Sequence, residues 1–153
     1  MNGLETVLAT HAFTSGMNSR YIRKLSECAS YTEIPAGEYI FRQGEPAETF
    51  YLILDGSVEV ELFSTTGGPV VLQKLDVGSA LGWSWLVPPC RWRFDARVVK
   101  ALKALKIDVT RLRTLMKEEP AFGYEILERF LQLMGERLES ERMSLVGLYA
   151  AHS

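Results

Sequence analysis

Short apolar runs, separated by glycines, fill the middle of this chain of 153 residues. The run at residues 57–62 alternates apolar with polar side chains, which is typical of a strand with one buried face. Asp55-Gly56 joins this run to the apolar run at residues 50–54, and an Asp-Gly pair in such a place predicts a hairpin. Other glycines stand at similar boundaries: Gly37, Gly44 and Gly78. Because glycine readily adopts the positive φ of tight turns, the pattern predicts a roll or sandwich of short strands.

A second alternation, over residues 91–98, predicts a later strand of the same roll. Its even-numbered side chains are apolar and its odd-numbered ones are charged. Since successive side chains of a strand point to opposite faces, this pattern turns Arg93 toward solvent. The inward side chains would then be Trp92, Phe94, Ala96 and Val98.

Helical spacing marks both ends of the chain. Ile22 and Leu25 share one face of a predicted amphipathic helix that opens the domain. Asp108 is a suitable N-cap for a short helix that ends near Met116. Pro120 begins the last helix, because proline at the first helical position loses no needed hydrogen bond. We therefore expect one domain over residues 1–153, divided into an N-terminal helical part at 12–30, a β-roll at 31–108 and C-terminal helices at 109–150.

The last helix carries a stripe with alternating spacings of three and four residues. Such a stripe suits a partner helix. The helix has about 28 residues and a length of about 40 Å, which is more than a domain of this size covers by itself. Glu141 interrupts the stripe, and we expect it beside Arg137 or Arg142. The alternative is a helix that packs only on its own roll. The predicted homodimer interface consists of Tyr124, Leu127, Leu131, Met134, Leu138, Leu145 and Leu148.

Composition narrows the classes of protein. The formal net charge is −2, so no global basic field favours nucleic acid. No apolar run has membrane-spanning length and no signal peptide opens the chain, which predicts a cytoplasmic protein. Cys28 and Cys90 are too few for a disulfide framework. A locally basic stretch is either an anionic docking patch or the solvated face of strands and a helix: Arg91, Arg93, Arg97, Lys100, Lys103, Lys106, Arg111 and Arg113.

One motif resembles a known family. The run Ile40-Phe41-Arg42-Gln43-Gly44-Glu45-Pro46-Ala47, followed by the apolar residues 50–53 and by Gly56, is similar to the first signature of cyclic nucleotide-binding domains of the Crp/Fnr superfamily. The resemblance extends over about residues 12–148. It implies a mainly β fold with flanking helices, namely an eight-stranded jelly roll with an N-terminal helix and a long C-terminal dimerisation helix.

The resemblance also implies a phosphate-binding cassette. Leu81-Gly82 and Leu86 match its frame, but Trp83 stands where the family has a glutamate for the ribose hydroxyl. Arg93 follows Gly82 at the family's spacing for the phosphate arginine, whereas a cassette shorter by one residue would place Trp92 there. The candidate ligands are cAMP, cGMP or another small molecule. The predicted ligand-binding residues are Gly82, Trp83, Ser84, Arg93 and Phe94.

Other functions lack the residues that they need. A metal-dependent enzyme on a β-roll needs inward histidines, and the only histidines are His11 and His152, both outside the predicted strands. Glu59 and Glu61 alternate with apolar residues and should face solvent. We expect no catalytic residue and no metal site, and iron–sulfur sensing needs more than two cysteines. The chain ends directly after its long helix, so we expect no direct DNA binding and signalling through a protein partner.

Two interpretations remain open at this point. The first is a non-catalytic, dimeric sensor domain of cyclic nucleotide-binding type with a divergent pocket. The alternative is a ligand-free dimeric scaffold in which the pocket is filled by aromatic side chains, namely Trp83, Trp85, Trp92 and Phe94.

Overall fold

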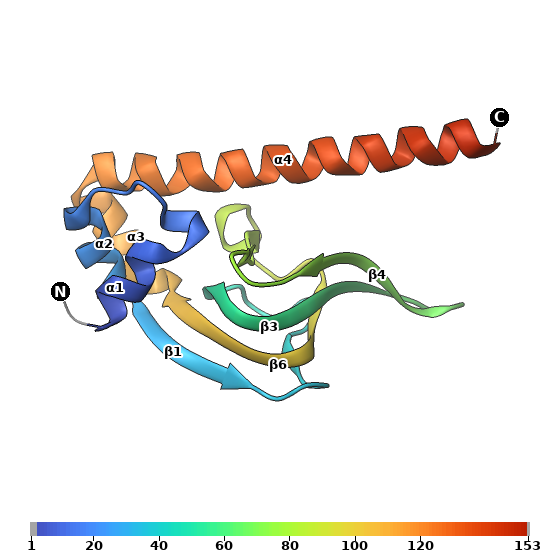
Figure 1. The fold of residues 1–153 in the computed structure, drawn as a ribbon, viewed down its shortest axis with the longest axis horizontal. Coiled ribbons are helices and arrows are strands. Elements are labelled where there is room, and N and C mark those ends of the chain that lie inside the picture. The colour runs from blue at the N-terminus through green and yellow to red at the C-terminus, as the bar shows by residue number, and fades with distance from the viewer. Residues whose placement is uncertain (1–2, 153) are drawn as a thin grey trace. The chain divides into compact units, whose positions relative to one another are not determined.

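The computed structural model of the chain describes residues 3–152, without the side chains at positions 64, 144, 145 and 148–152. Contacts along the chain divide it into two compact units, Met1–Leu115 and Met116–Ser153. The first unit holds the sheet and the short helices, and the second is dominated by one long helix (Figure 1). A single domain over residues 1–153 therefore stays a prediction.

The first unit combines short helices with a sheet. Its helices are α1 (Gly3–Thr10), the 3₁₀ helix η1 (Ala12–Thr14), α2 (Ser19–Ser26), the 3₁₀ helix η2 (Ser84–Leu86) and most of α3 (Val109–Glu118). Its strands are β1 (Ala29–Ile34), β2 (Tyr39–Phe41), β3 (Thr49–Ser64), β4 (Gly68–Leu75), β5 (Ala80–Leu81) and β6 (Asp95–Asp108).

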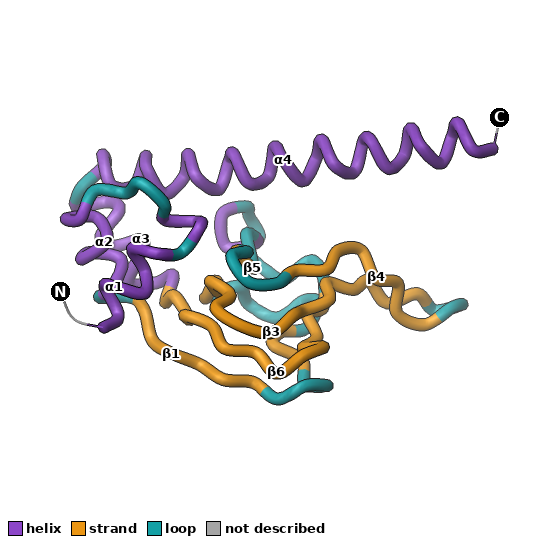
Figure 2. Tube along the Cα trace, in the orientation of Figure 1, coloured by secondary structure: helices purple, strands orange, loops and turns teal. Residues whose placement is uncertain are grey.

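The sheet is antiparallel throughout. The order along its main path is β1-β6-β3-β4, while β2 pairs with β6 and β5 pairs with β3. Figure 2 shows β6 between β1 and β3, with β4 continuing from β3 as a long hairpin. The two central strands supply much of the core, including Phe50, Leu52, Val58, Ala96, Val98 and Leu105. The predicted class, mainly β with flanking helices, is confirmed.

The strand count differs from the expected eight, since six strands lie within residues 3–152. The reason is that β3 and β6 are 16 and 14 residues long and bend instead of ending. Their pairing shifts register between Ile53 and Val58, where the two strands turn the corner of the roll together. Each of these long strands therefore spans a length that was expected to hold two shorter strands.

The Asp55-Gly56 hairpin is the clearest wrong prediction of local structure. Gly56 has φ +91°, as a tight turn would require, but it lies inside β3. A Cβ atom at Gly56 would approach the Ala101 carbonyl oxygen of β6 to 2.2 Å. The glycine therefore marks a bulge and a close approach of two backbones, both of which share the sequence signature of a turn.

Two helices begin at residues whose side chains cap them, and one of these caps, Asp108, was predicted. Asn18 Oδ1 accepts a hydrogen bond from the Arg20 N–H at 2.8 Å and begins α2. Asp108 Oδ1 accepts from the Thr110 N–H at 2.9 Å and begins α3, as predicted. Helix α1 lies before the helical part expected at 12–30 and was missed. These caps satisfy N–H groups that a helix start leaves without intrahelical partners.

The second unit contains α4 (Pro120–His152), which begins at the predicted proline. Much of the predicted interface stripe is exposed: Tyr124 by 68%, Leu127 by 46%, Leu131 by 67% and Leu138 by 53%. Met134 is half-buried, and the side chains of Leu145 and Leu148 lie outside the described residues. A separate stripe with helical spacing is buried and consists of Phe122, Ile126 and Phe130.

Glu141 has the neighbour that the sequence suggested. Burial lowers the pKa of the Arg137 guanidinium, and the Glu141 carboxylate opposes that shift. The two residues are four positions apart, where side chains of one helix meet. The interruption of the apolar stripe is therefore an acidic position that interacts electrostatically with Arg137.

Candidate functional site

The segment between β5 and β6 contains the predicted cassette. Gly82 opens it with φ +99°. A Cβ atom at this position would lie 2.7 Å from Cη2 of Trp92 and 2.9 Å from its Cζ3. Only glycine lets the indole ring of Trp92 approach so closely. Trp92, near the end of the segment, therefore packs directly on Gly82 at its start.

Trp92 makes further contacts besides the one with Gly82. Its ring stacks on Phe41 of β2, with centroids 3.6 Å apart and planes 6° apart. The backbone adds two bonds, because the Gly44 N–H donates to the Trp92 carbonyl at 2.8 Å and the Trp92 N–H donates to the Glu45 carbonyl at 2.9 Å. These contacts replace the strand predicted at residues 92–94, since β6 begins only at Asp95.

Arg93 lies neither against Gly82 nor free in solvent. Its guanidinium is 5.7 Å from the centre of the Trp83 ring, a distance suited to a cation–π contact. Its Nη2 donates to the Pro88 carbonyl at 3.3 Å. Its Nε is buried and has no hydrogen-bond partner within the described part of the chain. Arg93 thus supports the loop of the cassette while one of its donors stays unused.

The remaining predicted ligand residues occupy the same segment. Trp83 is half-buried and stands at the N-cap of η2, where its side chain supplies no capping bond. Ser84 is buried in η2, and Phe94 is half-buried beside the start of β6. The structure therefore brings Trp83 and Arg93 together, whereas Gly82 is covered by Trp92, which was not among the predicted ligand residues.

Trp85 belongs to the core. It is 1% exposed, and its ring lies parallel to that of Phe50 with centroids 5.8 Å apart. The Arg113 guanidinium of α3 lies 5.4 Å from the centre of the Trp85 ring, and its Nη2 donates to the Trp85 carbonyl. Such packing makes Trp85 a structural anchor of the cassette.

A charged cluster beside the cassette was missed by sequence reasoning. Glu61 of β3 is only 2% exposed, so the prediction that it faces solvent is wrong. Its Oε2 lies 3.4 Å from Arg97 Nε, and the Tyr39 hydroxyl donates to its Oε1 at 3.5 Å. Glu59 pairs with the same guanidinium at 3.1 Å. Register explains the error. Arg97 of β6 lies opposite Glu59 of β3, and β2 pairs with β6 so that Tyr39 lies opposite Arg97.

Asp95 is the second buried acid of this region and lies opposite Glu61 in the pairing of β3 with β6. Its carboxylate accepts a hydrogen bond from the Gln43 N–H at 2.7 Å and lies 3.4 Å from Arg42 Nε. The acid therefore fixes the loop that carries Gly44, which in turn holds Trp92. A charge that would repel an anionic ligand is neutralised here by a structural partner.

Three arginines of the basic stretch have internal roles. Arg91 Nη1 donates to the Gly44 carbonyl at 2.8 Å, Arg93 donates to the Pro88 carbonyl, and Arg97 pairs with glutamates. These three guanidinium groups therefore have partners within the fold. The exposed residues of the stretch include Lys100, Lys103 and Lys106 of β6 and Arg111 of α3.

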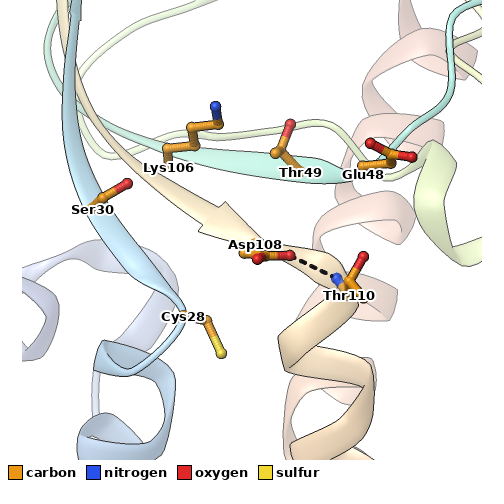
Figure 3. Close-up of a pocket in the computed structure, with 7 residues that line it drawn as sticks. All are labelled: Cys28, Ser30, Glu48, Thr49, Lys106, Asp108 and Thr110. Carbon is orange, nitrogen blue, oxygen red and sulfur yellow. Dashed lines mark hydrogen bonds between the residues drawn. The ribbon is translucent and has the colours of Figure 1, made fainter.

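A separate cavity of about 430 Å³ lies where β1, β3 and β6 meet the start of α3 (Figure 3). Cys28 lies at this cavity, and burial is the main cause that raises the pKa of its thiol to about 11. The Asp108 carboxylate is used there as the cap of α3. No cassette residue lines the cavity. The lining residues are Cys28, Ser30, Glu48, Thr49, Lys106, Asp108 and Thr110.

Two negative findings concern the described part of the chain. Within residues 3–152, no group of three or more His, Cys, Asp or Glu side chains is arranged to hold a metal ion. No helix in that range combines the length and apolarity needed to cross a membrane.

Comparison with known proteins identifies the family. Residues 31–119 match the family model of the cyclic nucleotide-binding domain. A CRP-like cAMP-activated global transcriptional regulator of Mycobacterium tuberculosis is 23% identical over 145 residues, which cover 95% of this chain and 63% of the regulator. The chain thus spans less than two thirds of that relative's length.

Solved structures agree on the fold. A putative cyclic nucleotide-binding protein from Geobacter metallireducens has a TM-score of 0.77 at 22% identity and covers 90% of this chain and 99% of its own. The regulatory subunit of a cAMP-independent protein kinase A from Trypanosoma brucei has a TM-score of 0.73 at 20% identity, covering 94% of this chain and 50% of its own. With its sheet, its capped helices and more than half of its length matched to one family model, the chain belongs to the cyclic nucleotide-binding domain family.

Proposed function

We propose that this chain is a non-catalytic regulatory domain whose nucleotide pocket is occupied by its own Trp92. The observation that carries the proposal is the indole ring seated against Gly82, where a Cβ atom would meet it at 2.7 Å. A nucleotide phosphate at the cassette would need that glycine accessible, because backbone N–H groups at a helix start are what hold such an anion. The stack on Phe41 stabilises the filled state.

The missing acceptor supports the same conclusion. Trp83 has no oxygen with which to accept a hydrogen bond from a ribose hydroxyl, and its ring already contacts Arg93. Burying a polar hydroxyl of the ligand without a partner would cost free energy. The name of the M. tuberculosis relative describes activation by cAMP, whereas that of the T. brucei structure describes independence from cAMP. The cassette geometry favours the second behaviour for this chain.

Signalling would then depend on association. The exposed stripe on α4 supports a homodimer, with a further protein partner that reads the state of the helices. This arrangement corresponds to the dimeric scaffold whose pocket aromatic residues fill. Cytoplasmic location stays a prediction from the sequence.

One observation favours a second candidate, a sensor for a small anionic ligand such as cAMP or cGMP. Arg93 Nε is buried without a hydrogen-bond partner among the described residues. Such an unused donor costs free energy in the folded chain, and an incoming anion would satisfy it. In this case Trp92 would have to leave Gly82 when the ligand binds.

A nucleotide titration separates the two candidates. Thermal unfolding and tryptophan emission would be followed with cAMP, cGMP and, as a control, 5′-AMP. A ligand at 100 times its dissociation constant stabilises a protein by about 2.7 kcal/mol. We expect no shift of the unfolding midpoint up to millimolar cyclic nucleotide. A saturable rise specific to the cyclic forms would contradict the filled cassette and support the sensor.

Two variants make this test sharper. Trp92→Ala removes the ring from Gly82, and the pair W83E with W92R supplies a carboxylate acceptor and a guanidinium. We expect cyclic nucleotide to raise the unfolding midpoint of the double variant and to leave that of the native chain unchanged. Failure of both variants to bind, with circular dichroism unchanged, would mean that Trp92 is not what closes the pocket.

A further inference from the structure

Two rows of polar residues cross the sheet at the end where α3 begins. In one row, Ser30 of β1 lies opposite Lys106 of β6. In the next row, Thr49 of β3 lies opposite Asp108 of β6. The Asp108 N–H also donates to the Cys28 carbonyl at 2.8 Å, which adds Cys28 to this second row. Because opposite residues of an antiparallel pair point to the same face, the register of three strands gathers these side chains in one place.

These residues line the cavity of about 430 Å³ in Figure 3, together with Glu48 and Thr110. Small-molecule sites typically have volumes of about 300–1,000 Å³. The described lining contains no aromatic ring and no large aliphatic side chain. A nucleotide base or another flat apolar ligand would therefore find no ring to stack on, whereas a small polar ligand is suited to the cavity.

The backbone around the cavity is fixed by hydrogen bonds between its walls. The Val109 N–H donates to the Glu48 carbonyl at 3.0 Å, so the residue before β3 is tied to the first residue of α3. The bond from Asp108 to Cys28 ties the end of β6 to the residue before β1. A site held in this way loses less conformational freedom when a ligand binds.

Two opposite charges of the lining are available to a ligand. Lys106 and Glu48 are exposed, and neither forms an ion pair or a side-chain hydrogen bond within the described part of the chain. In Figure 3 they lie on either side of the Thr49 hydroxyl. The Asp108 carboxylate differs, because its Oδ1 already accepts from the Thr110 N–H at 2.9 Å. The start of α3 is thus capped by the chain itself, and Lys106 and Glu48 are the charged groups left for a ligand.

We propose that this cavity binds a small zwitterion of the α-amino acid class. The ligand carboxylate accepts from the Lys106 ammonium, and the ligand ammonium donates to the Glu48 carboxylate. Both contacts are charge-assisted hydrogen bonds, which are stronger than bonds between neutral groups. The hydroxyls of Ser30, Thr49 and Thr110 supply further polar contacts around the ligand.

The balance of charge selects this class over simple ions. Two carboxylates, of Glu48 and Asp108, face one ammonium, of Lys106. A simple anion such as phosphate therefore meets more negative than positive charge, and a simple amine gains nothing from Lys106. A ligand with both charges uses the lysine and the glutamate together.

An NMR titration of the ¹⁵N-labelled chain tests the proposal. Each of the standard amino acids would be added up to about 10 mM, which detects dissociation constants in the millimolar range. We expect at least one of them to shift the amide signals of residues 28–30, 48–49 and 106–110 in a saturable way. The matching amine without the carboxylate, and the matching acid without the ammonium, should each bind at least about tenfold more weakly.

Variants of the two charged residues complete the test. K106Q and E48Q should each weaken the binding of that amino acid at least about tenfold. Lys103 and Glu33 provide matched controls, because they are exposed, lie opposite each other on β6 and β1 and do not line the cavity. K103Q and E33Q should therefore leave the titration unchanged. W92A should do so too, since no cassette residue lines the cavity, and a failure of the proposed cassette function would not affect this result.

Three outcomes would overturn the proposal. The first is that none of the amino acids gives saturable shifts at the cavity. The second is an amine or an acid that binds as tightly as the amino acid, which would mean that only one of the two charges is used. The third is a loss of binding in K103Q or E33Q as large as in K106Q or E48Q, which would indicate a general effect of surface charge.

Discussion

At the scale of single residues, His11 shows how burial selects a protonation state. Its Nε2 lies 3.1 Å from the Ile53 carbonyl oxygen, and its Nδ1 accepts from the Phe13 N–H at 3.0 Å. One ring nitrogen must donate and the other must accept, which only the neutral imidazole can do. Burial lowers the pKa of His11, against a smaller opposing effect of the hydrogen bond to Ile53. The residue is structural and has no metal-binding role in this arrangement.

This geometry predicts a loss of stability in mild acid. Folding lowers the pKa of His11, so the unfolded chain binds the proton more readily, with a pKa of about 6.5. The free energy of unfolding should therefore decrease as the pH falls below that value, by at most about 1.4 kcal/mol per pH unit for one proton. Urea unfolding from pH 7.5 to pH 5 would measure this slope. H11Q, which cannot titrate, should show a smaller slope, and equal slopes would contradict the assignment.

At the scale of elements, the corner of the sheet depends on Gly56. Its φ of +91° strains any other residue, and a Cβ atom would also be 2.2 Å from the Ala101 carbonyl oxygen. Gly44 is a matched control, because it has φ +92° but nothing within 4 Å of its Cβ position. G44A should lose about 1–2 kcal/mol of unfolding free energy from backbone strain. G56A should lose at least about 3 kcal/mol, since β3 and β6 must also separate.

Chemical denaturation of the two variants would measure this difference. Equal losses would mean that the close approach of β3 to β6 at this corner is relaxed at no cost. The comparison also tests the bulge against the hairpin that the sequence suggested, because a hairpin tip would leave the Cβ position of Gly56 open.

The ion-paired cluster between β2, β3 and β6 predicts an asymmetry between its two partners. In E61M the buried acid is replaced by an apolar side chain, and Arg97, whose side chain is one third exposed, can turn to water. Unfolding free energy should then stay within about 1 kcal/mol of the native value. In R97M the Glu61 carboxylate stays buried without its cation, so the loss should be larger. R111M, which breaks an exposed pair, should change stability by less than about 0.5 kcal/mol.

Urea unfolding of these three variants gives the test. A larger loss of unfolding free energy in E61M than in R97M would contradict this prediction. It would show that water solvates the Glu61 carboxylate when Arg97 is removed.

The same elements show what the sequence could predict and what it could not. The cap at Asp108 and the start of α4 at Pro120 depend only on residues that are close in sequence. They could therefore be predicted from the sequence alone. Gly56 has the positive φ that was expected, but a turn and a bulge demand the same residue, and only the pairing with β6 decides between them. Alternation placed Glu61 in solvent, because the covering Arg97 comes from a strand that is far away in sequence.

The packing of the cassette differs from the sequence pattern for a related reason, while its ligand-binding residues stay a prediction. Alternation at residues 91–98 favoured a strand, whereas Trp92 hydrogen-bonds instead with the loop at Gly44 and Glu45. The family spacing pointed to Arg93 as the residue nearest Gly82, while a spacing shorter by one pointed to Trp92, and both were compatible with the sequence. The choice depends on which side chain fits over a glycine, which is a matter of packing and not of pattern.

At the scale of the whole molecule, the sheet and the cassette are the features expected of the family. Helix α4 adds an exposed apolar stripe. The exposed stripe includes Tyr124, Leu127, Leu131 and Leu138, all at the spacing of a helix–helix interface. A buried stripe of Phe122, Ile126 and Phe130 follows different positions of the same helix. The exposed stripe is therefore an apolar surface distinct from the buried one, and it suits a partner helix.

We therefore predict a homodimer that depends on the exposed stripe. L131E with L138E should weaken association at least 100-fold, because burial of two leucines contributes about 3–6 kcal/mol and each tenfold change corresponds to about 1.4 kcal/mol. Gln132→Glu adds a charge to an exposed position outside the stripe and should leave the dimer intact. Sedimentation velocity over a range of concentrations measures both, with circular dichroism to confirm folding. A native chain that stays monomeric at about 100 μM, or a Q132E variant as weak as the double variant, would exclude this stripe as the interface.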